Sequence, residues 1–415
     1  MPDTFDYLII GAGIIGLTTA YELKKRYPAC RIGVLEKENR LGAHASGRNS
    51  GVLHSGIYYP KHTLKAKVCS TGARRMFDFA QNYGIPVKRT GKLIVATSEQ
   101  DVPGLDTLLQ NARDNHIHAD RLASAEIRAL EPYAQSDYGG IVCHDTAVID
   151  PLAVLKELRR QLESQGVQFF LQHEFRTLAT ERASLITSDG QRWTFGFLFN
   201  CAGAHADEVA KQFNLAQDYE LIPFKGIYYK LDPRKQNWVR SSIYPVPNLF
   251  LPFLGVHFTR VISGDVYVGP TAIPALGREN YGLLSGMHFG EAMQIFRHLA
   301  GLYIDNAYNF RRLVHLEMSK YAKPFFVKSA RRLVPLVQSV DLVPSSKVGI
   351  RPQLFNIRQK KLEMDYILED TPNSMHILNA ISPAFTGSFA FAEFIVSRYE
   401  ERVKHSRSDH AVNLS

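Results

Sequence analysis

The chain has 415 residues, which is too long for one compact core and suits two domains, or one large domain with an insertion. Its hydrophobic content of 45% and charged content of 21% are typical of a globular protein, and it has no run of about 18 apolar residues that would predict a membrane span. The net charge of +9 is compatible with nucleic acid, an anionic membrane surface or an acidic small molecule, but without an RNA-binding motif, a zinc finger or a concentrated basic tract we do not expect nucleic acid as a partner.

The first residues predict a strand, a helix and a second strand. The apolar run 5–10 is typical of a buried parallel strand, the helical pattern 17–27 ends at Pro28, and 31–35 supplies the next strand. The segment lacks the basic residues of a secretory signal, so we do not expect it to be cleaved. A strand, helix and strand in this order are the context in which a glycine-rich turn binds a dinucleotide.

Such a turn lies between the first strand and the helix. Gly11, Gly13 and Gly16 form G-x-G-x-x-G, and Glu36 ends the second strand 20 residues after Gly16. The glycines allow a tight turn and a close approach of backbone to pyrophosphate, the helix N-terminus offers free N–H groups, and the acid can accept hydrogen bonds from a ribose. The motif predicts a dinucleotide site and leaves FAD and NAD open.

The remaining elements predict an α/β protein. Helical patterns occupy 64–83, 123–130, the segment from 151 to 162, roughly 286–335 and 386–399, and buried strands occupy 91–97, 167–171, 195–201 and 375–378. Residues 219–273 differ, because short aromatic and β-branched runs between Pro and Gly replace the helices. We therefore expect an antiparallel sheet there.

The four cysteines, Cys30, Cys69, Cys143 and Cys201, stand singly without a C-x-x-C pair. This spacing argues against a disulfide framework and against a zinc site. We expect no metal and a reducing cytoplasmic location.

Several segments together resemble one protein family. They are 48–60 (RNSGVLHSGIYYP), 91–96 (GKLIVA), 200–203 (NCAG), 252–260 (PFLGVHFTR) and 349–353 (GIRPQ). With them the chain resembles the FAD-dependent family of D-amino-acid oxidase, glycine oxidase and sarcosine oxidase, and most closely its L-2-hydroxyglutarate dehydrogenase branch. The chain departs from that branch at residues 60–63, 225–227 and Phe385, which leaves the exact substrate open.

The resemblance implies a Rossmann-type FAD-binding domain assembled from residues 1–85, 141–216 and 331–415. Residues 86–140 and 217–330 would form a substrate domain built on the antiparallel sheet. FAD would bind without a covalent bond, although His44 lies where some relatives attach flavin. Ser50 and Gly51 would pass under the flavin ring, Ala202 and Gly203 would also contact the cofactor, and the helix from about Gly387 would point its N-terminus at the ring.

The reaction implied is oxidation of L-2-hydroxyglutarate, or a similar 2-hydroxy acid, to the 2-oxo acid by hydride transfer to flavin N5. Such chemistry needs a carboxylate anchor and a base. Arg351 is the expected anchor because a guanidinium fork grips a carboxylate with two hydrogen bonds. His54 is the preferred base and His257 its rival, either as the base or as a second hydrogen bond to substrate. The alternatives are a structural ion pair for Arg351, a hydrogen bond to backbone or flavin for His54, and packing in the sheet for His257.

Several further residues are candidates for partner contacts. A second carboxylate of the substrate could be bound by Lys225, Tyr228, Tyr229 or Arg260, of which strand alternation allows only some to face one pocket. The basic and apolar residues of 320–334 could rest on the inner face of an anionic membrane and serve transfer of electrons to a quinone or another acceptor, or could be a solvated helix face. An amino-acid oxidase of the same fold and a flavin-binding protein without catalysis are the alternative functions.

Overall fold

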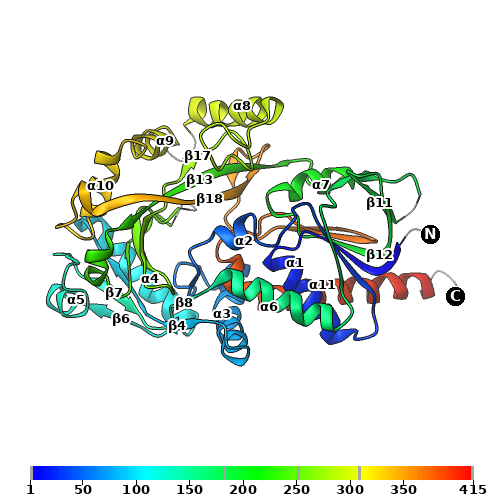
Figure 1. Ribbon diagram of the computed structural model, residues 1–415, viewed down its shortest axis with the longest axis horizontal. Coiled ribbons are helices and arrows are strands. Elements are labelled where there is room, and N and C mark those ends of the chain that lie inside the picture. Colours follow the sequence, from blue (N-terminus) through cyan, green and yellow to red (C-terminus); the bar gives the residue numbers. More distant parts are fainter. Residues whose placement is uncertain (1–2, 182, 250–252, 307–309, 413–415) are drawn as a thin grey trace.

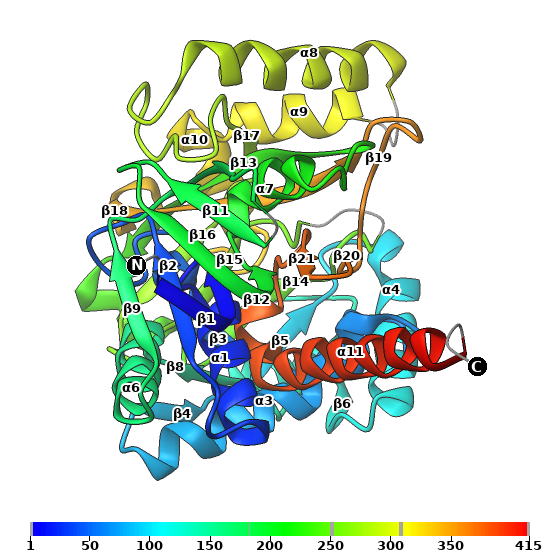
Figure 2. The ribbon, with the colours of Figure 1, turned by 90° about the vertical axis from the view of Figure 1, so that its right-hand side faces the viewer.

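The structure is a computed structural model that describes residues 3–181, 183–249, 253–306 and 310–412. Pro252, the first residue of the 252–260 segment, lies outside these ranges. Two large sheets make up most of the molecule, and both chain ends lie beside the smaller of them, at the right of Figure 1. Figure 2 shows the same arrangement turned by a quarter, with α8 and α9 at the top and α11 running across the lower half.

The smaller sheet has eight strands in the order β10-β11-β12-β1-β2-β9, with β21 paired to β12 and to β20. Its centre is parallel, since β1 pairs in parallel with both β2 and β12. The strands are β1 (Asp3–Ile10), β2 (Ile32–Glu36), β9 (Gln168–Leu171), β10 (Phe175–Leu178), β11 (Ser184–Thr187), β12 (Arg192–Asn200), β20 (Leu368–Thr371) and β21 (Ser374–Ile377). This parallel centre is the Rossmann-like unit expected from the sequence.

Helices flank this sheet and bury its apolar residues. They are α1 (Ile14–Arg26), α2 (Ala45–Arg48), α3 (Leu64–Asn82), α6 (Pro151–Ser164), α7 (Ala206–Gln212) and α11 (Ala384–Val412). Local chemistry starts α6 where predicted, because the Asp150 side chain accepts hydrogen bonds from the N–H groups of Leu152 and Ala153. Helices α3 and α11 cross closely at Gly72 and Gly387, where a Cβ on Gly72 would collide with the Gly387 backbone.

The larger sheet has ten strands and is mostly antiparallel, in the order β19-β18-β13-β16-β15-β14-β5-β7-β6, with β17 paired to β13. Its strands are β5 (Lys92–Val95), β6 (Ala119–Leu122), β7 (Gly140–Cys143), β13 (Tyr219–Leu231), β14 (Ser242–Pro245), β15 (His257–Arg260), β16 (Val266–Gly269), β17 (Ile273–Pro274), β18 (Leu342–Asn356) and β19 (Lys361–Leu362). A third, small sheet has the order β3 (Val52–Leu53), β8 (Ala147–Ile149), β4 (Val87–Arg89).

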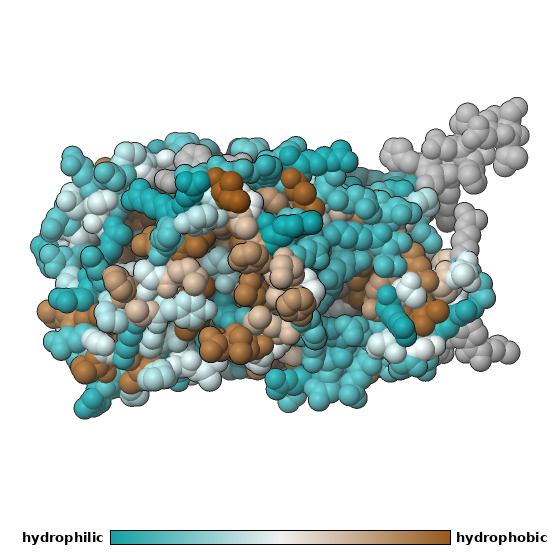
Figure 3. Space-filling view, turned by 90° about the horizontal axis from the view of Figure 1, so that it is seen from above, coloured by the Kyte–Doolittle hydropathy of each residue, from teal (hydrophilic) through white to brown (hydrophobic). Residues whose placement is uncertain are grey.

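The remaining helices surround the larger sheet. They are α4 (Val102–Asp114), α5 (Ser124–Leu130), α8 (Phe289–Asp305), α9 (Phe310–Ser319) and α10 (Lys323–Arg331), with short 3-10 turns at Glu99–Asp101, Gly203–His205, Pro233–Trp238 and Ser339–Asp341. Hydrophobic side chains gather on the face that carries α8 (Figure 3). None of the helices within the described residues combines the length and apolar content needed to cross a membrane.

The predicted α/β class, with a parallel nucleotide-binding unit and a large antiparallel sheet, is confirmed. The predicted strands and helices are present, and the helical region 286–335 contains three helices. The division into 1–85, 141–216 and 331–415 against the rest stays a prediction. Within it, β7 and β18, expected in the FAD-binding part, are strands of the larger sheet.

Candidate active site

A cavity of about 490 Å³ lies where the two sheets meet. Its lining comes from the segments after the parallel strands β1, β2 and β12, from α2, and from the strands β13, β15 and β18 of the larger sheet. Ligands of parallel α/β sheets bind beyond the carboxyl ends of the strands, so this is the position in which a dinucleotide is expected.

One end of the cavity is the glycine-rich turn. Gly11 has a φ of +99°, and a Cβ there would collide with the carbonyl oxygen of Cys201, so the turn requires glycine. A Cβ on Gly16 would collide with the carbonyl oxygen of Gly11, and its absence lets α1 approach the turn. Gly13 is the N-cap of α1 and provides no side-chain cap; the Ile14 N–H instead donates to Ser46 Oγ at 2.9 Å, and Gly13 and Ile15 line the cavity at this helix start.

Glu36 is fixed beside this turn. Its Oε2 accepts a hydrogen bond of 3.0 Å from the Ala12 N–H, and its Oε1 accepts one of 3.0 Å from the Glu38 N–H. A carboxylate oxygen can accept more than one hydrogen bond, so the group can still bind a ribose hydroxyl. Glycines, helix N-terminus and acid therefore form one unit suited to a dinucleotide.

The other predicted cofactor residues divide into two groups. Ser50, Ala202 and Gly203 line the cavity. Gly51 is not among the described lining residues, because it packs against β8, where a Cβ would collide with the carbonyl oxygen of Ile149. Gly387 is also not among the described lining residues, because it packs against Gly72 of α3.

Thr386 reaches the cavity at the start of α11, a role that we did not predict for it. Its Oγ1 donates a hydrogen bond of 3.2 Å to the Val52 carbonyl and accepts one of 3.2 Å from the His54 N–H. The C-terminal helix thus fixes the segment that carries His54.

The three predicted catalytic residues line the same cavity, at the side formed by the larger sheet. His54 follows β3, His257 begins β15, and Arg351 lies in β18 opposite Phe224 of β13. Segments about 300 residues apart in the sequence are thus brought together by the β13–β18 pairing and the small β3 sheet. Their roles stay predictions, but their convergence meets the geometric requirement for them.

His257 has a defined tautomer. Its Nδ1 lies 2.8 Å from the carbonyl oxygen of Gly255, and since a carbonyl only accepts, Nδ1 carries the proton and Nε2 is the acceptor. The ring stacks on Tyr244 with centroids 3.8 Å apart. Burial lowers the pKa of His257 to about 3, and the positive charges of Arg351 and Lys92 act in the same direction, while the hydrogen bond to Gly255 opposes them.

His54 is neutral for the same physical reason. Burial lowers its pKa to about 3, the positive charges of Lys92 and Arg351 add to the effect, and protonation of His257 would act in the same direction. Its Nδ1 is buried and has no hydrogen-bond partner among the described residues. A buried polar atom in this state costs free energy, so a ligand in the cavity is the partner that would satisfy it.

Lys92 is a buried cation that sequence reasoning missed. Its Nζ lies 4.2 Å from the ring centre of Tyr58 and 5.3 Å from that of Tyr244, and burial lowers its pKa to about 8. Its strand, residues 92–95, was predicted, but which face of the strand would be buried depends on pairing with β7 and β14. Lys92 places a positive charge near both imidazoles.

Three of the four residues expected to bind a second carboxylate do not line the cavity among the described residues, which corrects that expectation. Along β13, Phe224, Gly226 and Tyr228 face the cavity, so strand alternation turns Lys225 and Tyr229 away from it. Lys225 donates instead to Asn280 and Gly282, and Tyr229 packs on Phe326.

Arg260 is also turned away from the cavity. Its Nη1 donates to the carbonyl oxygens of Gln236 and Val239, each at 3.0 Å. Tyr228 is the candidate of this group that the structure retains.

An ionic network at the mouth of the cavity joins α2 to the loop after β17. Glu279 accepts from His205 at 2.9 Å and from Lys37 at 2.5 Å. These contacts hold the pKa of Glu279 well below its usual range. Burial lowers the pKa of His205, but the hydrogen bonds to Glu208 and Glu279 outweigh burial and raise this pKa to about 9. No local sequence pattern joins these residues, so the network was not predicted.

His44 belongs to the same network. Its Nδ1 lies 2.8 Å from the Tyr281 hydroxyl and its Nε2 lies 2.9 Å from Glu38 Oε1. Both ring nitrogens are thus engaged by protein groups, which supports non-covalent attachment of a cofactor.

Comparisons with known proteins agree with this geometry. The family model described as FAD dependent oxidoreductase matches residues 6–398. The L-2-hydroxyglutarate dehydrogenase of Indibacter alkaliphilus is 35% identical over 390 residues, which cover 93% of this chain and 96% of that protein. The mitochondrial L-2-hydroxyglutarate dehydrogenase of Homo sapiens is 33% identical over 418 residues, covering 96% of this chain and 89% of that protein.

Two solved structures share the fold. L-alpha-glycerophosphate oxidase from Mycoplasma pneumoniae with FAD bound has a TM-score of 0.74 at 23% identity, covering 94% of this chain and 93% of that one. Glycine oxidase from Geobacillus kaustophilus has a TM-score of 0.70 at 15% identity, covering 96% of this chain and 95% of that one. At such identities the likeness concerns the fold alone.

Proposed function

Because this chain belongs to the FAD-dependent oxidoreductase family, we propose that it is the enzyme that oxidises L-2-hydroxyglutarate, or a similar 2-hydroxy acid, to the 2-oxo acid. The observation that carries the proposal is the convergence of Arg351, His54 and His257 on the cavity that also contains the glycine-rich turn. The reaction requires a carboxylate anchor and a base, and a guanidinium and a neutral imidazole can supply them. Relatives at 33–35% identity that bear the name L-2-hydroxyglutarate dehydrogenase support the choice of substrate.

The cavity fits FAD, the cofactor of the family. Gly11, Gly13 and the start of α1 would hold the pyrophosphate and Glu36 a ribose, and His54, with its buried Nδ1, lines the same cavity. When bound, FAD supplies the acceptor, at N5, for the hydride that leaves the substrate Cα. Since His44 is engaged by Tyr281 and Glu38, we propose that the cofactor is held without a covalent bond.

The protein groups would divide the remaining work. Arg351 binds and orients the substrate carboxylate through its fork of N–H donors. A neutral imidazole, His54 in our assignment, accepts the hydroxyl proton as the Cα–H bond breaks, and His257 offers its Nε2 as a hydrogen-bond acceptor. Phe224 and Phe253, whose ring centres lie 4.8 Å apart, form an apolar wall that limits water.

Anaerobic reduction of the bound flavin tests the substrate directly. We expect L-2-hydroxyglutarate to bleach the visible flavin absorbance of the purified holoenzyme, while the D enantiomer and amino acids leave it unchanged. Stopped-flow absorbance measures this half-reaction without any knowledge of the electron acceptor. Bleaching by an amino acid alone would move the assignment to an amino-acid oxidase, for which Arg351 serves equally well. If neither class of acid reduced the flavin, the protein would be a flavin-binding protein without this catalysis.

We propose that the membrane contact expected at residues 320–334 lies instead at helix α8. Within 320–334, Lys320 is buried beside Glu317, and Phe326, Val327 and Leu333 are buried in the core, so few apolar groups remain at the surface. On α8, by contrast, Phe289, Met293, Phe296 and Ile304 recur at helical spacing and are exposed, Phe289 by 83%. The opposite face of α8 is buried through Ile295 and Leu302.

We propose that this α8 face, together with the exposed Leu283 and Leu284 before it, rests on an anionic membrane surface. It lies within the hydrophobic area of Figure 3. Arg297 on α8 and Arg311 and Arg312 on α9 are exposed beside it, and among the described residues of these two helices Asp305 is the one exposed acid. Apolar groups flanked by arginines suit an anionic interface. Such a position would serve electron transfer to a membrane quinone, on the cytoplasmic side, where four unpaired cysteines remain reduced.

Co-sedimentation with lipid vesicles tests this contact. We expect the protein to pellet with vesicles that contain phosphatidylglycerol and to remain in solution with phosphatidylcholine alone. Since burying one phenylalanine contributes about 1.5–3 kcal/mol, F289S and F296S should each weaken binding by about tenfold or more. L130S, on α5, is the matched control, because Leu130 is an exposed apolar residue of a different helix and should leave binding unchanged. Equal pelleting of all variants, or a loss of self-association in place of vesicle binding, would contradict the proposal.

A further inference from the structure

The edge of the ten-stranded sheet at β6 holds a group of side chains of the types that bind metals. None of them is among the described residues that line the cavity. Strands β6 and β7 are antiparallel, with Ala119 opposite Cys143, which places His118 opposite His144. A backbone hydrogen bond links the two residues, because the His144 N–H donates to the His118 carbonyl at 3.0 Å. The two imidazoles are therefore held at adjacent backbone positions by the sheet itself.

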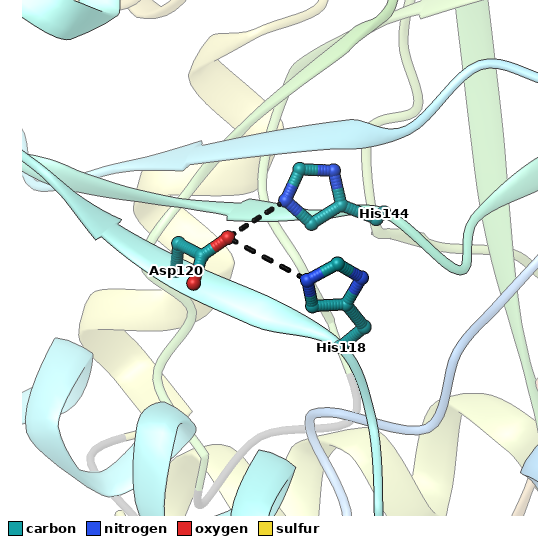
Figure 4. A group of neighbouring side chains, drawn as sticks. All are labelled: His118, Asp120 and His144. Atoms are coloured by element: carbon teal, nitrogen blue, oxygen red, sulfur yellow. Dashed lines mark hydrogen bonds and ion pairs between the residues drawn. The ribbon is translucent and has the colours of Figure 1, made fainter.

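Asp120 completes the group. It lies two residues after His118, so strand alternation puts both side chains on the same side of β6. Asp120 Oδ2 lies 2.9 Å from His144 Nε2 and 3.8 Å from His118 Nε2, and the imidazole ring centres lie 4.3 Å apart. Figure 4 shows both rings pointing at the same carboxylate oxygen, and one ligand atom from each residue lies within 4.8 Å of the others.

We propose that His118, Asp120 and His144 bind a divalent transition-metal ion, for which Zn²⁺ is the best match. Two imidazole nitrogens and one carboxylate oxygen are a common protein set for zinc, with bonds of about 2.0–2.2 Å. Ligand atoms at those bond lengths lie about 3.3 Å apart around a tetrahedral ion, close to the separations present here. Three protein ligands leave the fourth position to water.

The charges around Asp120 favour this site over the second cluster of similar composition. Among the described ion pairs, the partners of Asp120 are the two imidazoles. In the cluster of Glu38, His44 and Glu279, Lys37 already binds both carboxylates, at 2.7 and 2.5 Å. Lys37 thus already places a positive charge at the second cluster, whereas no lysine or arginine is paired with Asp120 among the described residues.

The position of the site indicates its effect. The three side chains are exposed by 70%, 61% and 42%, and none is among the residues that line the cavity. The bound ion would join β6 to β7 at the edge of the sheet. It would stabilise the folded state by an amount that increases with the concentration of the ion relative to its Kd. The expectation from the cysteine spacing, that the chain has no metal site, did not consider histidines on neighbouring strands.

Titration of the holoenzyme with Zn²⁺ tests the site, with any affinity tag removed beforehand. Isothermal titration calorimetry should give one ion per chain, and Co²⁺ should give the visible absorption of a four-coordinate ion. H118A and H144A should each weaken binding about tenfold or more, and the double variant should lose it. H62A is the matched control, because His62 is an exposed histidine elsewhere on the surface and should bind as the parent does.

The thermal midpoint gives a second readout. Zn²⁺ should raise the midpoint of the parent protein and of H62A but not of the double variant. The flavin absorbance of the double variant should remain normal, because neither histidine is among the residues that line the cavity. The proposal is overturned if the double variant binds Zn²⁺ with unchanged stoichiometry and affinity, which would assign the ion to other residues, or if the parent protein binds none.

Discussion

Substitution of Arg351 by methionine is expected to raise the Kd for L-2-hydroxyglutarate by about 30-fold to several thousandfold. Removing one partner of a buried, hydrogen-bonded charge pair costs about 2–5 kcal/mol, and each 1.4 kcal/mol is a factor of ten. Arg351 lies in β18 beside the Phe253 ring, where the substrate carboxylate would be shielded from water. The Kd follows from the substrate dependence of flavin reduction under anaerobic conditions.

Two further variants test whether substrate binding depends on the two parallel hydrogen bonds of the Arg351 guanidinium or on its positive charge alone. R351K keeps the cation and loses the two parallel hydrogen bonds, so its Kd should fall between those of the parent and of R351M. R260M is the matched control, because Arg260 lies in the same sheet but donates to the carbonyl oxygens of Gln236 and Val239. An unchanged Kd in R351M, with normal FAD content, would remove Arg351 from the site. An effect of R260M as large as that of R351M would show that the loss is not specific to the anchor.

The parts of this structure that local sequence determines were predictable. In the glycine-rich turn, a Cβ on Gly16 would collide with the carbonyl oxygen of Gly11 a few residues earlier, so the close approach of α1 follows from local sequence. Asp150 and Pro151 likewise start α6 through contacts inside one turn. In each case the chemistry that the pattern indicates is complete within the segment that carries it.

The parts of the structure that depend on pairing between distant strands were not predictable from local sequence. Lys225 and Tyr229 are chemically suitable for binding a carboxylate, but the register of β13 with β18, and its irregularity between Ile227 and Tyr229, decides which side chains reach the cavity. Gly51 and Gly387 fit a close approach to a cofactor, yet each serves a close approach to backbone instead. A glycine shows that space is limited, and only the fold shows what fills it.

The same limit applies to the prediction of a membrane contact at residues 320–334. The cations and apolar residues of 320–334 resemble a membrane-binding stretch in sequence, but α10 turns Phe326 and Val327 into the core. Helix α8 exposes its apolar residues, although its pattern alone is that of an ordinary amphipathic helix. Periodicity identifies the apolar face of a helix, whereas its tertiary neighbours decide whether that face is covered.

Substitution of the catalytic base should have the second large effect. H54N is expected to slow flavin reduction by about 100- to 10,000-fold, the usual contribution of a positioned general base. Asparagine keeps a polar group of similar size at the buried position, so FAD binding should persist. H257N should have the smaller effect of a lost hydrogen bond to substrate, because Nδ1 of His257 is engaged by Gly255 and only Nε2 remains for a ligand. A normal rate in H54N together with a large loss in H257N would reverse the two roles.

The pH dependence of flavin reduction follows from the same two imidazoles. A base must be unprotonated, and burial, with the charges of Lys92 and Arg351, lowers the pKa of both His54 and His257 to about 3. The rate should therefore stay level from pH 8 to about pH 5, whereas an unperturbed histidine would lose activity below about pH 6.5. In K92M the loss of a positive charge should raise the pKa of His54 and move the acidic fall in rate to higher pH. If the parent enzyme already lost activity with a midpoint near pH 6.5, the base would be a solvated histidine and not one held neutral by burial beside Lys92.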